Sequence, residues 1–233
     1  MIGCNFEELD ELDIPFNRKV GLTVYLDDVK YEFFVILKRG SDKLLILSPS
    51  AINKSSKFDR TGPYPTGAHG NFPTQQSTTN PTRYWCPEDI DTGWCIGTRD
   101  NWYLLNISKI IMTIASNAGI ENSRILFYGS SSGSYNSIQL ATLNRDTRFL
   151  VDIPQLNISH YWPRHWINIK KYCFGDMDEE LILTEYGHRI SIIDLFNHEN
   201  YFPKGTLMMD CSAEKDFNRQ YTPFLYNLNN PEI

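Results

Sequence analysis

The sequence predicts an α/β domain in which helices cover both faces of a mostly parallel β-sheet. Three observations predict this fold class. Two alternating segments flank Asp27-Asp28, a short apolar run follows at Lys43–Leu47, and strand and helix patterns then alternate to about residue 210. Alternation of strands with helices is typical of a parallel sheet covered by helices. The length of 233 residues suits one hydrophobic core, so we expect one domain spanning residues 1–233.

The first elements are strands. Residues 21–26 and 31–37 alternate apolar and polar side chains around Asp27-Asp28, which predicts a β-hairpin. Residues 43–47 are continuously apolar after the lysine, as in a strand buried on both faces. From residue 48 to about 87 the chain is rich in Ser, Thr, Asn, Pro and Gly, so we expect a long irregular segment there.

The later elements follow from the helical and strand periodicities. In chain order we expect a helix at 102–117, a strand at 124–128, a helix at 134–143, a strand at 148–153, an irregular aromatic-rich section at 161–174, a helix at 179–196, a strand at 205–210 and a short helix at 217–228. Ligands of such sheets bind at the carboxyl ends of the strands, so the functional residues are expected at that edge.

Composition excludes several classes of function. The net charge is -6 and the basic residues form no stripe, so we expect no nucleic-acid partner. The five cysteines are scattered without a Cys-x-x-Cys pair, which favours reduced thiols and a cytoplasmic location. The acidic N-terminus is unlike a signal peptide, and the longest apolar stretch, 107–120, is too short to cross a membrane. No metal-ligand or cofactor motif is present, so neither is expected.

The segment after the strand at 124–128 contains Gly129-x-Ser131-x-Gly133. This spacing is typical of a nucleophile elbow, in which a serine sits in a strained turn between a strand and a helix. Glycines on either side remove Cβ atoms that would collide there. We therefore predict Ser131 as a nucleophile and the backbone N–H of Ser132 as an oxyanion donor. The alternative is a Ser/Gly-rich turn; a phosphate loop is disfavoured because no Lys-Ser/Thr pair follows.

With this elbow in this order of elements, the chain resembles the α/β-hydrolase superfamily over nearly its whole length. The resemblance implies that the loop after Leu47 supplies a second oxyanion donor, for which Ser50 is the candidate, although the His-Gly-Gly-Gly form is absent. It also implies a lid-like section, here residues 155–200, between the elbow and the last strands.

Three segments are similar to a narrower bacterial group. They are Asp91-Thr-Gly-Trp94-x-Ile-Gly97, the elbow itself and Ile153–Tyr161. Members of that group are hydrolase-like proteins encoded with surface-polysaccharide and glycoprotein-export functions, including the acetyltransferase component of accessory secretion systems. The resemblance implies a glycan or other acyl substrate and a protein partner in such a system. Trp94 and His160 are then candidates for substrate contact.

The acid of a catalytic triad is expected just beyond the last strand, where Asp216 stands, with Asp210 as second choice. An ordinary helix-capping role for Asp216 is the alternative. In the superfamily the histidine follows the acid, yet all five histidines precede Asp216. We therefore expect a C-terminally truncated domain that lacks the last strand and helix, with its histidine beyond Ile233.

Two functions remain from the sequence. The first is serine-dependent acyl hydrolysis or O-acyl transfer on an ester or acetyl-sugar substrate, with the full-length protein as the enzyme. The second is a non-catalytic hydrolase-like module that binds a partner in a surface-polysaccharide or glycoprotein-export system.

Overall fold

The computed structural model describes residues 2–50, 77–83, 94–175 and 177–229. Its elements are, in chain order, β1 (Ile2–Asn5), η1 (Phe6–Glu11), β2 (Lys19–Leu26), β3 (Val29–Ile36), β4 (Leu44–Ser48), β5 (Ser77–Arg83), α1 (Tyr103–Asn117), η2 (Asn122–Arg124), β6 (Ile125–Ser130), α2 (Ser132–Leu143), β7 (Arg148–Asp152), α3 (Pro163–Ile169), η3 (Lys170–Phe174), α4 (Glu179–Ile190), α5 (Ile192–Glu199), β8 (Lys204–Met208), α6 (Glu214–Asp216), η4 (Phe217–Tyr221) and α7 (Thr222–Asn229).

The strands that the structure describes form one sheet in the order β1-β2-β3-β5-β4-β6-β7-β8. The pairs β2–β3 and β3–β5 are antiparallel, and every other pair of neighbours is parallel. The expected hairpin is confirmed as β2 and β3, and the expected apolar strand is β4, paired in parallel with β5 and β6 on its two sides. The predicted fold class, a largely parallel sheet flanked by helices, is therefore confirmed.

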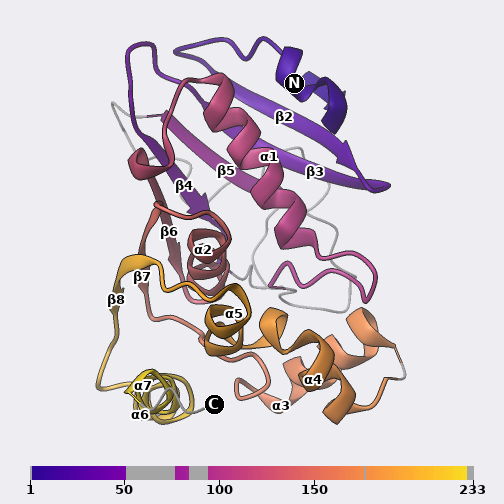
Figure 1. The fold of residues 1–233 in the computed structure, drawn as a ribbon, viewed down its shortest axis with the longest axis vertical. Helices are drawn as coiled ribbons and strands as arrows, with labels where there is room; N and C mark the ends of the chain where they lie inside the picture. The colour runs from indigo at the N-terminus through magenta and orange to yellow at the C-terminus, as the bar shows by residue number, and fades with distance from the viewer. Residues whose placement is uncertain (1, 51–76, 84–93, 176, 230–233) are drawn as a thin grey trace, which may run out of the picture.

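Two helices dominate one face of the sheet (Figure 1). Helix α1 buries an apolar stripe that includes Ile107, Ile111 and Ile114, as its 3.6-residue periodicity predicts. Helix α2 packs against α1, α5 and the strands β4, β6 and β7, and every residue from Ser132 to Thr142 is buried. A helix that is buried on all sides shows little amphipathic periodicity. Its packing also fixes the position of the turn that precedes it.

Two strands were missed by the sequence analysis. Strand β5 lies within the segment expected to be irregular, because Ser-Thr-Thr-Asn-Pro-Thr-Arg carries no apolar alternation. Its neighbours β3 and β4 nevertheless offer it hydrogen-bonding partners on both sides. Strand β1 also lacks a clear pattern, and it pairs with only β2 at the edge of the sheet. In both cases strand pairing, a long-range interaction, overrides local composition.

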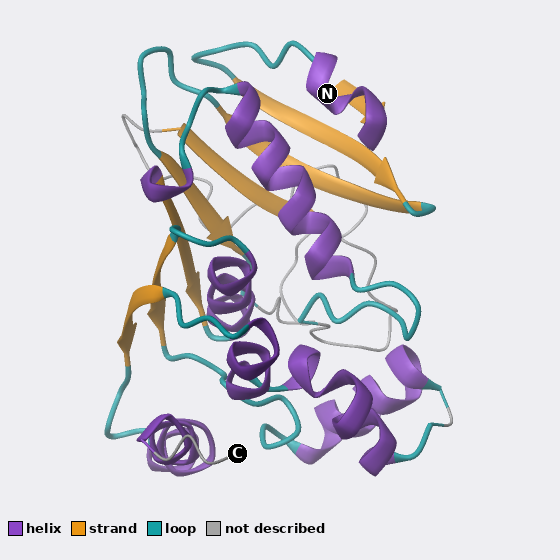
Figure 2. Ribbon diagram, viewed as in Figure 1, coloured by secondary structure: helices purple, strands orange, loops and turns teal. Residues whose placement is uncertain are grey.

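The section between β7 and β8 is more helical than expected (Figure 2). The aromatic-rich section predicted as irregular forms α3 and η3. The single helix predicted at 179–196 is two helices, because Ser191 adopts an extended conformation with φ -128° and ψ 133°. The Ser191 hydroxyl caps α5 by accepting from the backbone N–H of Asp194.

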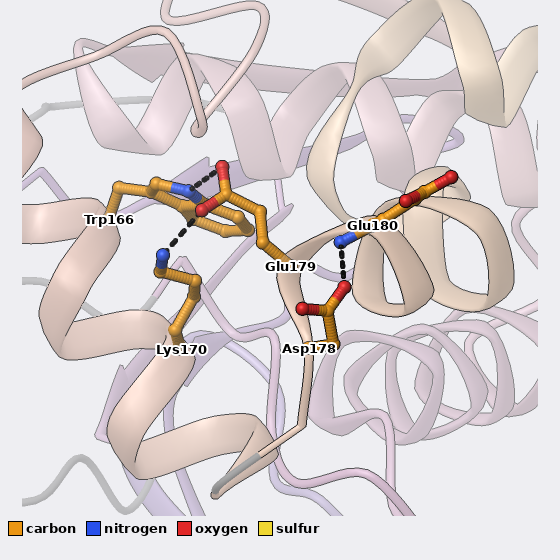
Figure 3. Close-up of polar contacts among 5 residues, drawn as sticks. All are labelled: Trp166, Lys170, Asp178, Glu179 and Glu180. Atoms are coloured by element: carbon orange, nitrogen blue, oxygen red, sulfur yellow. Dashed lines mark hydrogen bonds and ion pairs between the residues drawn. The ribbon is translucent and has the colours of Figure 1, made fainter.

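Side-chain contacts tie α3 to the start of α4 (Figure 3). The carboxylate of Glu179 accepts hydrogen bonds from the Trp166 indole, at 3.0 Å, and from the Lys170 ammonium, at 2.5 Å. Asp178 caps α4 by accepting from the backbone N–H of Glu180. The contacts of Glu179 therefore join α3 and η3 to the first turn of α4. In the described ranges, no helix combines the length and apolar character needed to cross a bilayer.

Candidate functional site

Ser131 lies in the turn between β6 and α2, as the spacing of its flanking glycines predicts. Its backbone has φ 53° and ψ -121°, a conformation that non-glycine residues rarely adopt. Two hydrogen bonds from this turn end on the carbonyl of Asp152 in the neighbouring strand β7. The Ser131 N–H donates to it at 3.0 Å and the Ser134 hydroxyl at 2.7 Å. The strained conformation is thus maintained by the sheet itself.

The two elbow glycines are required by close backbone approach. A Cβ atom on Gly129 would lie 2.1 Å from the carbonyl oxygen of Gly133, and one on Gly133 would lie 2.5 Å from the carbonyl oxygen of Ser48. Both distances are far inside normal contact, and both opposing atoms belong to the backbone. The sequence argument for these glycines therefore has a direct steric explanation.

The predicted oxyanion donors lie beside Ser131. Ser132 begins α2, so its backbone N–H belongs to the first turn, where amides lack an intrahelical partner. The side chain of Ser132 is 2% exposed, and its hydroxyl has no hydrogen-bond partner in the described structure. The Ser50 hydroxyl donates to the carbonyl of Ser130 at 2.9 Å, which joins the loop after β4 to the elbow.

A glutamine that the sequence analysis did not single out contacts the serine directly. The Nε2 atom of Gln155 donates to Ser131 Oγ at 3.2 Å, and its Oε1 atom accepts from the Trp94 indole at 2.5 Å. Gln155 is 5% exposed and follows β7 by three residues. Gln155 follows the carboxyl end of β7, which lies next to the elbow strand β6. That position was the sequence signal that could have identified it as a site residue. Trp94, whose contact with substrate stays a prediction, is fully buried and connects to Ser131 through Gln155.

A second glutamine holds the chain next to Gln155. The Oε1 atom of Gln220, in η4, accepts from the backbone N–H groups of Leu156 and Asn157 at 2.7 and 2.8 Å. Its Nε2 atom donates to the carbonyl of Asn157 at 3.0 Å. Gln220 is buried, so these three hydrogen bonds replace water for the backbone that carries Gln155.

Backbone strain gathers around this site. Trp94 and Cys95 have φ values of 43° and 54°, and Ile153, a β-branched residue, has 46°. Positive φ at such residues costs of order 1–3 kcal/mol each. Such conformations persist where the surrounding structure enforces them, and they cluster at functional sites. The strain at residues 94–95 and 153, together with that of Ser131 itself, therefore supports this edge of the sheet as the functional one.

The remaining predicted residues lie farther along the chain from this network. Asp216 ends the short helix α6 and is half-exposed, and His160 is exposed in the turn before α3. In the described structure neither is hydrogen-bonded to Ser131. Asp216 contributes charge near Tyr161, whose pKa is raised first by burial and then by that carboxylate. His160 acts electrostatically on Asp194, whose pKa is raised mainly by desolvation.

One histidine packs beside the network. The ring of His165, in α3, lies 5.8 Å from the Trp94 ring and 5.5 Å from the Tyr161 ring, between centroids.

A separate polar cleft of about 330 Å³ lies at the opposite, amino-terminal edge of the strands, near Arg148 and Lys204. Among the described residues no cluster of three or more His, Cys, Asp or Glu side chains is arranged to hold a metal ion.

No protein family and no curated protein sequence matches the chain. Several solved structures are similar to it. An S-formylglutathione hydrolase from Agrobacterium tumefaciens aligns with a TM-score of 0.58 at 11% identity, over 92% of this chain and 85% of that one. The capsule O-acetyltransferase of Neisseria meningitidis serogroup A aligns with a TM-score of 0.51 at 15% identity, over 87% and 96%.

A third similar structure is the Glycosylation Associate Protein (Gap123) complex from Streptococcus agalactiae. It aligns with a TM-score of 0.50 at 13% identity, over 90% of this chain, which spans 47% of that chain's length. At these identities the likeness concerns the fold. The chain has an α/β-hydrolase-like fold, as its sequence resemblance implied.

Proposed function

We propose that this chain carries out serine-dependent acyl chemistry, either hydrolysis of an ester or transfer of an acyl group to a hydroxyl. The observation that carries the proposal is the strained backbone of Ser131 between β6 and α2, with the amino end of a buried helix directly behind it. That geometry presents a hydroxyl at the carboxyl edge of the sheet and a set of amides beside it. The similar structures that are named a hydrolase and an O-acetyltransferase support the same reaction class.

In the proposed reaction Ser131 Oγ attacks the acyl carbon while its proton passes to a base. The carbonyl oxygen becomes an oxyanion, which accepts hydrogen bonds from the N–H of Ser132 and from the Ser50 loop. Collapse of this intermediate expels the alcohol, which takes up the proton from the base, and leaves an acyl-serine. Attack by water then gives hydrolysis, and attack by a sugar hydroxyl gives transfer. Asp216 is the proposed partner of the base, which in the superfamily is a histidine.

An ester or acetyl-sugar substrate is proposed from the aromatic surface near the network. Trp162 is 41% exposed, next to Tyr161, and the cations of Lys215 and Arg219 lie 6.0 and 5.2 Å from its ring. An exposed indole provides a flat apolar face of the kind that stacks on sugar rings. His160, exposed at the start of the same section, remains a proposed substrate contact. In the same proposal residues 155–200 act as a lid over the site within a single domain.

A second candidate function is a non-catalytic module that binds a partner protein or glycan. The observation in its favour is that the group hydrogen-bonded to the Ser131 hydroxyl is the amide of Gln155 rather than an imidazole. The similarity to a glycosylation-associated complex is consistent with an assembly role. The two candidates differ in whether Ser131 reacts with an acyl-like electrophile.

A fluorophosphonate probe separates them, because it modifies activated serines covalently. We expect the full-length protein to be labelled and the Ser131→Ala variant to lose that label. The variant should keep the thermal unfolding midpoint of the unaltered protein. Asp216→Asn and His165→Ala variants then report on the acid and on the histidine that packs against Trp94. A folded full-length protein that shows no labelling at Ser131 supports the binding module and overturns the enzyme.

A further inference from the structure

The amide of Gln155 is locked in one orientation. Its Oε1 atom accepts from the Trp94 indole N–H, a group that can only donate, so Oε1 cannot exchange places with Nε2. The Nε2 atom therefore faces Ser131 Oγ at 3.2 Å. Burial raises the pKa of the Tyr161 hydroxyl, and hydrogen bonding by the same amide offsets a smaller part of that increase. Gln220 fixes the backbone immediately after Gln155.

The polarity of this contact has a chemical consequence. Both hydrogens of an amide nitrogen are donors, so Gln155 cannot accept a proton from the serine and cannot serve as its base. A donor aimed at Oγ instead stabilises negative charge on that atom. Such charge develops twice in acyl chemistry, when Oγ loses its proton during attack and when Oγ leaves from the acyl-serine.

We propose that Gln155 is a catalytic hydrogen-bond donor to Ser131 Oγ, and that Trp94 and Gln220 are positioning residues that present its Nε2–H to the nucleophile. This inference rests on the proposed role of Ser131, but it adds a donor at the nucleophile that is separate from the oxyanion donors Ser132 and Ser50. The site then contains one set of donors for the acyl oxygen and one for the attacking oxygen.

The effect of this donor can be measured without acyl turnover, by replacing the nucleophile with a titratable group and measuring its pKa. The Ser131→Cys variant carries a thiol whose pKa falls when a donor faces it. Cys211 is exposed and Cys86 lies outside the described residues, so both are changed to serine in every variant. The pH dependence of iodoacetamide alkylation then reports the pKa of the introduced thiol. The other three cysteines are buried, and mass spectrometry assigns the site.

Gln155→Met keeps the length of the side chain and removes the donor, so it should raise the pKa of the introduced thiol by about one unit. Gln155→Glu keeps the acceptor for Trp94 but places a carboxylate at the thiol, so it should raise the pKa further. The matched control is Gln139→Met, another buried glutamine, whose Nε2 bonds the Tyr135 hydroxyl instead. We expect this control to leave the thiol pKa unchanged.

A thiol pKa that is the same with Gln155 and with Gln155→Met overturns the proposal, and so does a pKa that Gln155→Glu lowers. Far-UV circular dichroism of each variant confirms that the comparison is between folded proteins. The outcome is independent of fluorophosphonate labelling. A non-reactive serine together with the expected thiol shifts would leave the donor established and refute only the proposed acyl chemistry.

Discussion

Gly129→Ala tests the elbow by adding one methyl group behind the nucleophile. The new Cβ would lie 2.1 Å from the carbonyl oxygen and 2.3 Å from the carbonyl carbon of Gly133, and 2.7 Å from the N of Ser134. Ordinary contacts of a Cβ atom begin at about 3.4 Å, so the overlap exceeds 1 Å at two atoms. All three atoms belong to the backbone of α2, so no rotamer change can relieve the clash.

The expected loss follows from what must move. Overpacking of a core by one methyl group costs about 1–3 kcal/mol when side chains can adjust. Here β6 and the first turn of α2 must separate, which strains the hydrogen bonds of Ser131 and Ser134 to Asp152. We therefore expect a loss of about 3 kcal/mol or more. That is a large part of the roughly 5–15 kcal/mol that stabilises a typical domain.

Urea denaturation followed by tryptophan fluorescence measures the loss, with two alanine substitutions as controls. Gly119→Ala meets nothing within 4 Å but has φ +68°, so it should cost about 1 kcal/mol through backbone strain alone. Gly205→Ala would place its Cβ 2.4 Å from the Phe149 ring, a side chain that can turn, so an intermediate loss is expected. A Gly129→Ala variant as stable as Gly119→Ala would refute the steric account of the elbow.

Three further predictions concern residues around the site. Gln220→Met should destabilise the fold by about 2–4 kcal/mol, because the buried N–H of Leu156 and the part-buried N–H of Asn157 lose their acceptor, and urea denaturation should show it. Burial, then the charges of His198 and Arg189, lower the pKa of His188 from 6.5 to about 4. Between pH 6.5 and 4, His188 is therefore protonated in the unfolded chain and neutral in the folded protein. The free energy of unfolding should fall as pH decreases through this range, by roughly 1–2 kcal/mol once solvent screening of this half-buried group is allowed for. Thermal midpoints across this range should flatten in His188→Phe, and an unchanged slope would contradict the assignment. Glu179→Gln, at a partly exposed pair, should cost less than about 1 kcal/mol, and a larger loss of thermal stability would show that this contact is essential to the packing of α3 and η3 against α4.

Local sequence determined the elements whose signals are local. Alternation around Asp27-Asp28 predicted the β2–β3 hairpin, and apolar runs predicted β4 and α1. The pair Gly129 and Gly133 predicted the elbow because the two glycines lie in one contiguous motif, and a Cβ on Gly129 would meet the backbone only four residues later, at Gly133. These features follow from backbone geometry and from periodic burial, which act over one or two turns of chain.

Other elements depended on partners distant in sequence. Strand β5 carries no apolar alternation and is defined by pairing with β3 and β4. The break at Ser191 is accompanied by an isolated bridge to Asn157, more than thirty residues earlier. Long-range pairing of this kind supplies hydrogen bonds that no local pattern reveals.

The candidate site likewise combines features that local sequence predicts with features that depend on residues distant in the chain. The sequence alone predicted Ser131 and the amide of Ser132 as site residues, since a nucleophile elbow is a contiguous motif. Only the tertiary structure showed that the Ser131 hydroxyl faces Gln155 and that Trp94 is a buried support behind that amide. The physical reason is that an amide can donate or accept, and its polarity at a given atom is set by the partner at its other end. That partner, the Trp94 indole, is 61 residues away from Gln155 in the chain and adjacent to it in the fold.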